Sequence, residues 1–371
     1  MNRQSAGKEC PVSRLLLLFG LLAVAACDNP AAPDIALAKT PEGATPPPSR
    51  KIVAASTVMD IGEPAGSARS VQAFDVNVTG AIAGFWVNPG GITRAFSWSA
   101  SGGFITLKPL GNLQHSYGFK VSDNGQVAGI SQSATGTNQA TIWTNGNPVS
   151  LGGLVPNGES LGMSVNVWGS AAGSATEADG TWRGFYYSFL TRRMQSVGVF
   201  PGGTYTMGQD INDWGQVVGY GDSPQGERAF LYNVLDGSLR NLGTIPGGTS
   251  SYALSINAAA QVVGFAFGTS GYPHGFLWDG QAMIDLGTLG GPQSVAFGIN
   301  DAGEVVGYSQ VPSGEFHAFV WTAESGMVDL GALPGGTVSY AQQINTNGLT
   351  AGIALDSGGK EHAVIWSVVL Q

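Results

Sequence analysis

The chain has 371 residues, of which 57 are Gly, or about 15 % against a usual share near 7 %. Charged residues make up 11 % and hydrophobic residues 43 %, a balance that excludes a disordered polyampholyte and a coiled coil. The formal charge of −9 argues against a nucleic-acid-binding protein, which needs basic stripes to meet the phosphate backbone.

The first 26 residues have the layout of a secretory signal peptide. Three basic residues, Arg3, Lys8 and Arg14, precede an apolar stretch at 15–26 that is too short to cross a bilayer as a helix. The stretch ends in the letters VAAC at 24–27, which resemble the bacterial lipobox, where the peptide is cut before a cysteine that is acylated. The resemblance implies that Cys27 is lipidated.

The cysteine content supports this interpretation. The chain has two cysteines, Cys10 and Cys27, and cleavage before Cys27 removes the first of them. A processed chain with one cysteine forms no internal disulfide, although an exported protein reaches an oxidising compartment. We therefore expect Cys27 to attach the protein to a membrane of the bacterial cell envelope, in the periplasm or at the cell surface.

Residues 27–54 are expected to form a disordered, proline-rich tether. The segment lacks the apolar periodicity of a helix or strand and contains six prolines: Pro30, Pro33, Pro41, Pro46, Pro47 and Pro48. The chain is thus divided into a signal peptide at 1–26, the tether at 27–54 and a folded domain at 55–371.

The folded part consists of repeats of about 45 residues, marked by two features with the same spacing. A glycine ends an element similar to VVG at Gly84, Gly129, Gly173, Gly219, Gly264, Gly307 and Gly352. An aromatic residue closes a second element at Trp98, Trp143, Tyr187, Tyr232, Trp278, Trp321 and Trp366. The sequence therefore predicts seven copies of one unit.

Each unit contains four short apolar runs separated by turn residues, and none is long enough for an amphipathic helix. In the sixth unit the runs lie at 295–300, 304–309, 316–321 and 326–330. Four antiparallel strands repeated every ~40 to 50 residues are typical of a β-propeller, so we predict an all-β, seven-bladed β-propeller. A glycine in all seven second strands predicts close backbone approach or a bulge.

The two ends of the folded segment are predicted to complete one blade. The chain stops just after a third-strand element at 362–366, while residues 57–62 (TVMDIG) match the missing fourth strand. Pairing the N-terminal strand with the C-terminal strand would close the ring and leave no sheet short of a strand. The alternative is an open solenoid of seven units, which needs polar capping units that the sequence does not contain.

Units four to seven share recognisable sequence motifs. The elements HAFVW at 317–321, VDLG at 328–331 and VVG at 305–307 resemble the HAF-repeat family of bacterial repeat proteins. The match is weaker where the histidine position holds another residue, at Arg94, Gln139, Arg183 and Arg228, and where Ser122 replaces an asparagine. The resemblance implies an extracellular repeat architecture and no particular activity.

Candidate ligand groups recur once per unit, which favours structural roles. His274, His317 and His362 share one repeat position where other blades place arginine, so we interpret them as strand-edge residues and predict no metal site. Asp123, Asp213 and Asp301 lie in turns without the spacing of a calcium loop, and we predict no cofactor. The preceding asparagines either stabilise turns or form an amide ring at one channel mouth: Asn77, Asn166, Asn212, Asn257, Asn300 and Asn345.

Two tryptophans break the repeat. Trp168 and Trp214 occupy the same turn position in the third and fourth units, where exposed indole rings could stack on sugar rings or bind a protein partner. Packing against an adjacent blade is the structural alternative. Trp182, Arg192 and Arg193 are expected in loops of the same third unit, which makes it the most irregular one.

A ligand site is expected at the channel mouth where the inner strands begin. The candidate binding residues there are Arg69, Tyr117, Tyr205, Tyr252 and Tyr340. His115 and Glu159 come from neighbouring units and could act as a catalytic acid and base pair.

The leading hypothesis is a lipid-anchored binding or scaffold module of the cell envelope that recognises a glycan or an envelope protein through its loops. The alternative is a hydrolase or lyase that acts on polysaccharide, with His115 and Glu159 as catalytic residues. A third interpretation is that the repeats coat the cell surface without a specific ligand. The sequence gives no signal for a particular oligomeric state.

Overall fold

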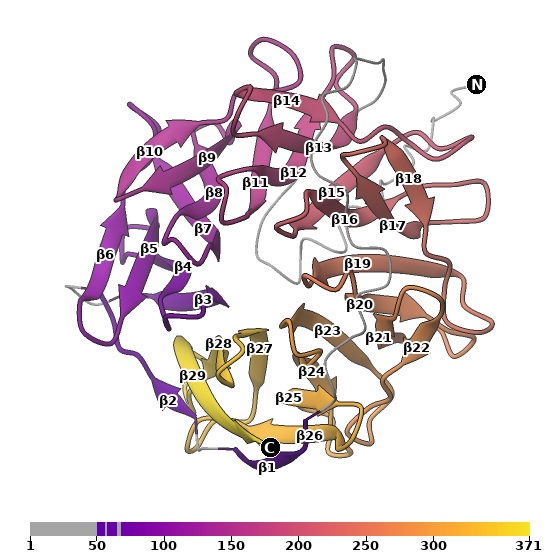
Figure 1. Cartoon of the computed structure of the whole chain (residues 1–371). Coiled ribbons are helices and arrows are strands. Elements are labelled where there is room, and N and C mark those ends of the chain that lie inside the picture. The colour runs from indigo at the N-terminus through magenta and orange to yellow at the C-terminus, as the bar shows by residue number, and fades with distance from the viewer. Residues whose placement is uncertain (1–49, 56–57, 65–67) are drawn as a thin grey trace, which may run out of the picture.

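In the computed structural model, seven sheets surround a central axis (Figure 1). The structure describes residues 50–55, 58–64 and 68–371. Six sheets have four antiparallel strands and one has five. The described residues form no helix, so none of them forms a helix that spans a membrane. The predicted all-β, seven-bladed propeller is confirmed.

The strands of each blade follow the chain outward from the axis (Figure 1). Blade 1 contains β3 (Ser70–Val76), β4 (Ile82–Val87), β5 (Thr93–Ser99) and β6 (Gly103–Leu107). Blade 2 contains β7 (His115–Val121), β8 (Val127–Gln132), β9 (Asn138–Thr144) and β10 (Asn147–Ser150). Blade 3 contains β11 (Ser160–Val165), β12 (Ala171–Thr176), β13 (Trp182–Ser188) and β14 (Arg193–Ser196). Blade 4 contains β15 (Thr206–Ile211), β16 (Gln216–Gly221), β17 (Arg228–Asn233) and β18 (Ser238–Asn241).

Blade 5 contains β19 (Ser250–Ile256), β20 (Val262–Phe267), β21 (Pro273–Trp278) and β22 (Met283–Asp285). Blade 6 contains β23 (Ser294–Ile299), β24 (Val305–Gln310), β25 (Phe316–Thr322) and β26 (Gly326–Gly331), which match the predicted runs to within one residue. Blade 7 combines β27 (Ser339–Ile344), β28 (Leu349–Leu355) and β29 (Glu361–Leu370) with two N-terminal strands, β1 (Ile52–Ala55) and β2 (Met59–Asp60).

The two ends of the folded segment close the ring in blade 7, as predicted. β2 pairs antiparallel with β29, so that Met59 lies opposite Ile365 and Asp60 lies opposite Val364. The Ile61 N–H continues the ladder to the Ala363 carbonyl at 3.0 Å. Blade 7 and blade 1 share one buried cluster, so the ring is sealed and the open solenoid is excluded.

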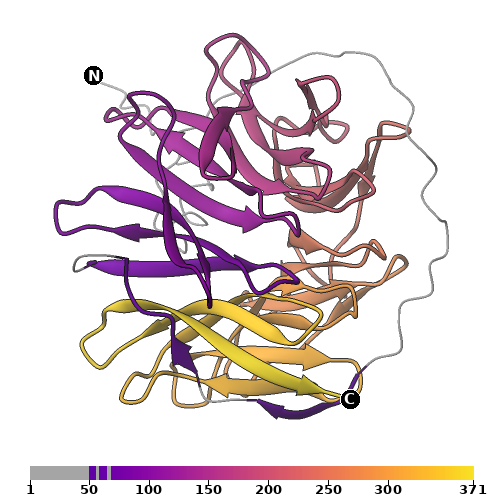
Figure 2. The same ribbon diagram turned by 60° about the vertical axis from the view of Figure 1, so that its left-hand side comes forward.

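The folded part begins earlier than predicted, because β1 falls within the segment expected to be tether up to residue 54. β1 pairs with the end of β29, which extends beyond the other third strands (Figure 2). The Arg50 guanidinium also forms an ion pair with Glu304 at 2.5 Å. The prolines stop at Pro48, and the apolar residues after it supply an edge for the long C-terminal strand. The signal peptide, Cys27 and most of the tether lie outside the described residues.

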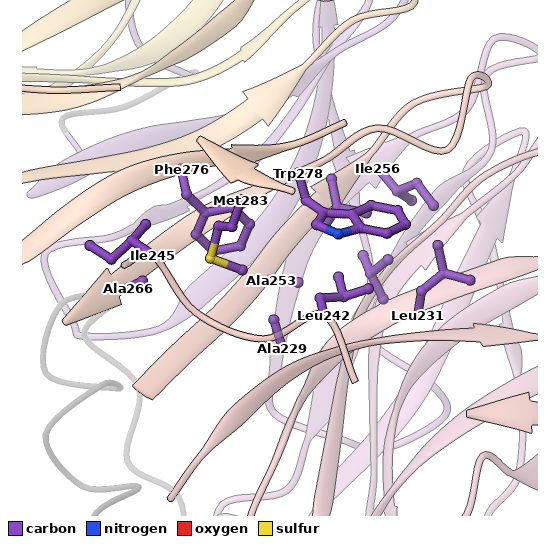
Figure 3. Close-up of a cluster of buried hydrophobic side chains, with 12 residues drawn as sticks. Ala229, Leu231, Leu242, Ile245, Ala253, Ile256, Ala266, Phe276, Trp278 and Met283 are labelled. Atoms are coloured by element: carbon purple, nitrogen blue, oxygen red, sulfur yellow. The ribbon is translucent and has the colours of Figure 1, made fainter. Parts of the chain in front are cut away.

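The hydrophobic core lies between the blades. Seven buried clusters each join two neighbouring blades. Figure 3 shows the cluster between blades 4 and 5, where Leu231 and Leu242 of one blade face Phe276, Trp278 and Met283 of the next. Because both faces of each sheet are covered, the strands consist of consecutive apolar residues and do not alternate between apolar and polar residues.

The repeated glycine of each second strand touches the backbone of the first strand. A Cβ atom at Gly219 would lie 1.9 Å from the Met207 carbonyl oxygen, and the other six sites are equally closed. The partner strand skips one residue at this point, so that Gly208 and Asp210 are paired while Gln209 is not. All seven first strands carry this bulge, and the predicted close approach and bulge are both present.

A buried hydroxyl links each pair of neighbouring blades from blade 1 to blade 7. Ser251, at the start of blade 5, accepts from the Ala229 N–H of blade 4 and donates to the Gly243 carbonyl. The same hydroxyl position is filled at Ser116, Ser160, Thr206, Ser294 and Ser339, all fully buried with the same two contacts. Each such bond contributes about 1 kcal/mol.

Gly219→Ala should destabilise the fold strongly, because the new methyl group meets a carbonyl oxygen that the sheet holds in place. We expect the free energy of unfolding in urea to fall by about 3 kcal/mol or more. Gly268→Ala is the matched control, since its Cβ would meet one side-chain atom at 3.5 Å and its φ is not positive. Equal stability of the two variants would contradict the close approach.

Candidate functional site

The seven innermost strands, from β3 to β27, surround the central axis of the ring (Figure 1). We call the end where the first and second strands of each blade are joined the turn face, and the end where the blades are connected the crossover face. The turn face carries the turns at 77–81, 122–126, 166–170, 212–216, 257–261, 300–304 and 345–349. Residues of all seven turns line one cavity at this end of the central axis.

Asparagines form an amide ring at the turn face. The Asn212 side-chain amide donates to the Asn257 carbonyl of the next blade at 3.1 Å, and its oxygen accepts from two backbone N–H groups of its own turn. The same link between blades is made by Asn77, Asn166, Asn257, Asn300 and Asn345. Both interpretations of these residues therefore hold, because one side chain stabilises the turn and joins the blades.

Blade 2 interrupts the ring. Ser122 is too short to reach the Asn166 carbonyl, and its hydroxyl donates to Asn124 at 2.6 Å within the same turn. Gln126 consequently keeps a buried Oε1 without a hydrogen-bond partner, whereas the Oε1 atoms of Gln216 and Gln261 accept from their asparagines.

Ser122→Asn should complete the ring. The new amide would donate to the Asn166 carbonyl and to the unpaired Gln126 oxygen, and we expect the free energy of unfolding to rise by about 1 kcal/mol. Asn212→Ser is the reciprocal control, which should lower it by about 1–2 kcal/mol by leaving Gln216 unpaired. A decrease on Ser122→Asn in chemical denaturation would contradict the role assigned to the ring.

A cavity of about 150 Å³ lies inside the amide ring and is lined by residues of all seven blades. Two charged residues of first strands, Asp75 and Lys120, line it. The Lys120 ammonium is 3.7 Å from Asp75 and 3.5 Å from Asp210, a buried first-strand residue directly before the lining residue Ile211. The two carboxylates are 2 % and 3 % exposed. The other four blades have uncharged residues at this repeat position: Ser164, Ser255, Gly298 and Gln343. The charged residues Asp75, Lys120 and Asp210 are therefore specific to this site.

The environment shifts the protonation of these groups. Burial raises the pKa of Asp75 to about 6, although the Lys120 ammonium and the Val121 N–H act in the opposite direction. Burial disfavours the charge of Lys120, but Asp210 and Asp75 outweigh it and raise the pKa of Lys120. The cation is thus kept charged, and the pKa of Asp75 lies at about 6.

Asp75→Asn should change the pH dependence of stability. The pKa of Asp75 is about 6 in the folded chain against an ordinary value of 3.8, so between these values the folded chain binds a proton that the unfolded chain has released. As pH rises from about 4 to 6, the free energy of unfolding should therefore fall in the wild type relative to the variant, by at most about 3 kcal/mol. Urea unfolding across this range measures the difference, and a constant difference would contradict the assignment.

Three aspartates stand on the rim of the cavity. Asp123, Asp213 and Asp301 each accept from a backbone N–H in the turn of the preceding blade, at 2.8–3.1 Å. Burial raises the pKa of Asp213, and the neighbouring carboxylates add to the effect. Among the residues that the structure describes, no group of three His, Cys, Asp or Glu side chains is arranged to hold a metal ion.

Trp168 and Trp214 directly follow lining residues of the cavity. Their indole N–H groups donate to the Asp213 and Ala258 carbonyls of the next blade, at 3.1 and 3.0 Å. The rings remain 65 % and 42 % exposed. The two alternatives for these residues are therefore combined, because contact with the next blade fixes each ring while leaving much of it open.

Trp182 was expected in a loop, and this expectation is wrong. It is the first residue of β13 and is 8 % exposed, packed in the aromatic cluster that contains Met207, Tyr220 and Tyr252. The strand begins one residue before Arg183, so Trp182 belongs to the sheet. It offers no surface to a ligand at the turn face.

The tyrosines expected at the crossover face are held by neighbouring groups. Tyr205 and Tyr252 both donate to the Glu227 carboxylate. Tyr117 donates to Gln132 at 3.4 Å, and Tyr340 stacks on Phe316 and lies edge-on to Tyr308. Arg69 is exposed at the start of blade 1. The cavity inside the amide ring lies at the opposite end of the channel from these candidates.

His115 and Glu159 have separate partners among the described residues. His115 Nδ1 accepts from the Thr93 N–H at 3.2 Å, and burial together with Arg94 lowers the pKa of His115. Glu159 accepts from the Asn138 side-chain amide at 3.0 Å. Each side chain thus joins its own strand to the preceding blade, and no hydrogen bond links the two.

The repeated histidines are structural, as interpreted from the sequence. His274 and His317 pair with Asp285 and Asp329 of the adjacent fourth strand at 2.9 and 2.8 Å. His362 pairs with Asp60 of β2 at 2.7 Å, so the strand that closes the ring repeats the same contact. The arginines at this position donate to loop carbonyls instead: Arg94, Arg183 and Arg228.

Comparison with known proteins gives the fold alone. No protein-family model and no curated protein sequence matches the chain. It is similar to an oligogalacturonate lyase in complex with manganese, at 10 % identity and a TM-score of 0.57 over 86 % of this chain and 96 % of that one. It is also similar to the oligogalacturonate lyase of Vibrio parahaemolyticus (11 %, 0.53, 84 % and 93 %) and to the β-propeller domain of the Trilobed protease from Pyrococcus furiosus (9 %, 0.54, 82 % and 96 %).

Proposed function

We propose that this chain is a binding module that recognises a glycan at the turn face of its propeller. The observation that carries the proposal is the fixed exposure of Trp168 and Trp214. Each indole N–H is held by the next blade, while the rings are 65 % and 42 % exposed. A rigid aromatic ring loses little entropy on binding, and its apolar face suits the C–H face of a sugar ring.

The cavity beside these rings supplies polar groups that complement sugar hydroxyls. Each hydroxyl both donates and accepts hydrogen bonds, and the cavity offers carboxylates together with the Lys120 ammonium. The contacts of Lys120 with Asp75 and Asp210, at 3.7 and 3.5 Å, are long for charge-assisted hydrogen bonds. A sugar hydroxyl beside these groups would accept from the ammonium and donate to a carboxylate.

The geometry favours binding over catalysis. His115 and Glu159, the pair predicted for a hydrolase or lyase, each hold a neighbouring strand and do not contact one another by a hydrogen bond. Similarity in shape to oligogalacturonate lyases concerns the fold and transfers no reaction to this chain.

We place this module in the bacterial cell envelope, attached through a lipid on Cys27. The support is the sequence of residues 1–27 and the resemblance to an extracellular repeat family. The tether would then keep the propeller within reach of envelope polysaccharides. An envelope protein is the other ligand class that exposed indole rings would suit.

Replacing both Trp168 and Trp214 by Ala should weaken glycan binding at least about tenfold, since two stacking faces are lost. The purified chain from residue 27, with Cys27→Ser, would be titrated with solubilised peptidoglycan and lipopolysaccharide polysaccharide by calorimetry. Tyr272→Ala, which removes a 48 % exposed aromatic side chain near the crossover face, is the control and should bind normally.

Unchanged binding of every captured glycan in the double variant would refute the placement of the site. Release of reducing ends by the unmodified chain would favour the polysaccharide-active alternative, and capture of a protein alone would assign the turn face to a protein partner.

A further inference from the structure

The turn between β13 and β14 in blade 3 has an apolar tip. Phe189 is 43 % exposed and Leu190 is 77 % exposed, and two arginines, Arg192 and Arg193, follow them. Among the described residues, no other blade exposes such a pair at this turn, and in blade 4 the corresponding Val234 is buried. The tip belongs to the turn face, because it joins the third and fourth strands at the same end as the amide ring.

The tip has a defined shape. The Phe189 N–H donates to the Ser170 hydroxyl at 3.3 Å, and the Arg192 N–H donates to the Ser188 carbonyl at 2.9 Å. The Arg192 guanidinium lies over the Phe189 ring at 5.2 Å. Phe189 also touches the turn that carries Trp168, because a Cβ atom on Gly169 would lie 3.0 Å from its ring. The exposed ring of Phe189 is therefore held in place against the turn that carries Trp168.

The N-terminal segment enters the fold at the turn face as well. Arg50 forms an ion pair with Glu304 and donates to the Thr346 carbonyl at 3.0 Å, and both partners lie in or beside turns of this face. Glu304 is 1 % exposed, so the contact is buried on one side. The 22 residues between Cys27 and Arg50 reach about 70 Å at most as an extended polyproline helix. A lipid on Cys27 would thus hold the turn face, which carries the apolar tip, near the membrane.

We propose that this tip, with Phe189, Leu190, Arg192 and Arg193, docks into the interfacial layer of a phospholipid bilayer together with Trp168 of the neighbouring turn. Phe189 and Leu190 would enter the boundary between headgroups and acyl chains, and the tryptophan ring suits the headgroup level. The arginines meet the lipid phosphates. A lipid chain with a second, weaker contact holds a protein more firmly than one chain alone. The inference goes beyond glycan binding and shares with it only Trp168.

The test measures binding to vesicles without the lipid anchor. The chain from residue 27 contains the whole described fold, and Cys27→Ser prevents acylation and oxidation. This protein would be sedimented with sucrose-loaded vesicles of phosphatidylethanolamine and phosphatidylglycerol at a 3:1 ratio. We expect measurable partitioning, reduced at least about tenfold in Phe189→Ser/Leu190→Ser.

The matched control removes two exposed isoleucines from outer strands, Ile105→Ser/Ile284→Ser, and should change partitioning less than about twofold. Thermal unfolding of both variants checks that the fold is kept.

No vesicle binding by the unmodified chain, or equal binding by the Phe189→Ser/Leu190→Ser variant, would overturn the proposal. A concentration-dependent dimer in light scattering that this variant abolishes, without vesicle binding, would assign the tip to a second copy. Since Phe189 and Leu190 are outside the glycan site, loss of vesicle binding with normal glycan binding would separate the two proposals.

Discussion

The propeller depends on a contact between backbones that admits no side chain. At each blade, the glycine of the second strand lies against a first-strand carbonyl, and a Cβ atom would come within about 2 Å of that oxygen. The first-strand residue paired with this glycine is also small in every case, Gly or Ala: Ala73, Gly118, Gly162, Gly208, Ala253, Ala296 and Ala341. Gly118, Gly162 and Gly208 lie in turn against the second-strand glycine of the preceding blade. Seven blades approach the axis closely because these positions are nearly empty, and the glycine excess of the chain follows in part from this constraint.

Close approach at the axis determines what the turn face can do. It brings seven equivalent turns together, so that one asparagine in every turn except that of blade 2 stabilises its own turn and joins the next blade. Most polar residues that recur in the repeat have structural roles: the serines join neighbouring blades, and the His–Asp pairs join the third and fourth strands of one blade. Features that suit a ligand or a membrane are instead the departures from the repeat, among them Lys120, Trp168 and Leu190.

The fold could be predicted largely from spacing. Two markers with a common period gave the blades, and the match of residues 57–62 to a fourth strand gave the closure that pairs Met59 with Ile365. The start of the folded part was missed, because neither β1 nor the pairing of Arg50 with the buried Glu304 belongs to the repeat. Pairing between residues 254 positions apart leaves no local pattern in the sequence.

The candidate site was predicted less well. Trp168 and Trp214 were recognised because they break the repeat. Trp182 was wrongly assigned to a loop, because it is the first residue of a strand and a shift of one residue in the predicted boundary moves it from loop to buried sheet. Asp75, Lys120 and Asp210 occupy the same repeat position in three different units, where the other units have uncharged residues. An alignment of the seven units would have shown this difference. Their closeness follows only from the ring, which places blades 1, 2 and 4 around one axis.

The most direct test of this account is a cross-link between the two strands that close the ring. In a chain with Cys10 and Cys27 replaced by Ser, Met59→Cys and Ile365→Cys would place two thiols at paired positions of β2 and β29. The account predicts that mild oxidation of the native protein forms this disulfide nearly completely within the monomer and raises its resistance to urea. If the chain keeps its strand content but forms no such bond, the ring is not closed. The cavity that the seven turns form together at the turn face would then not exist.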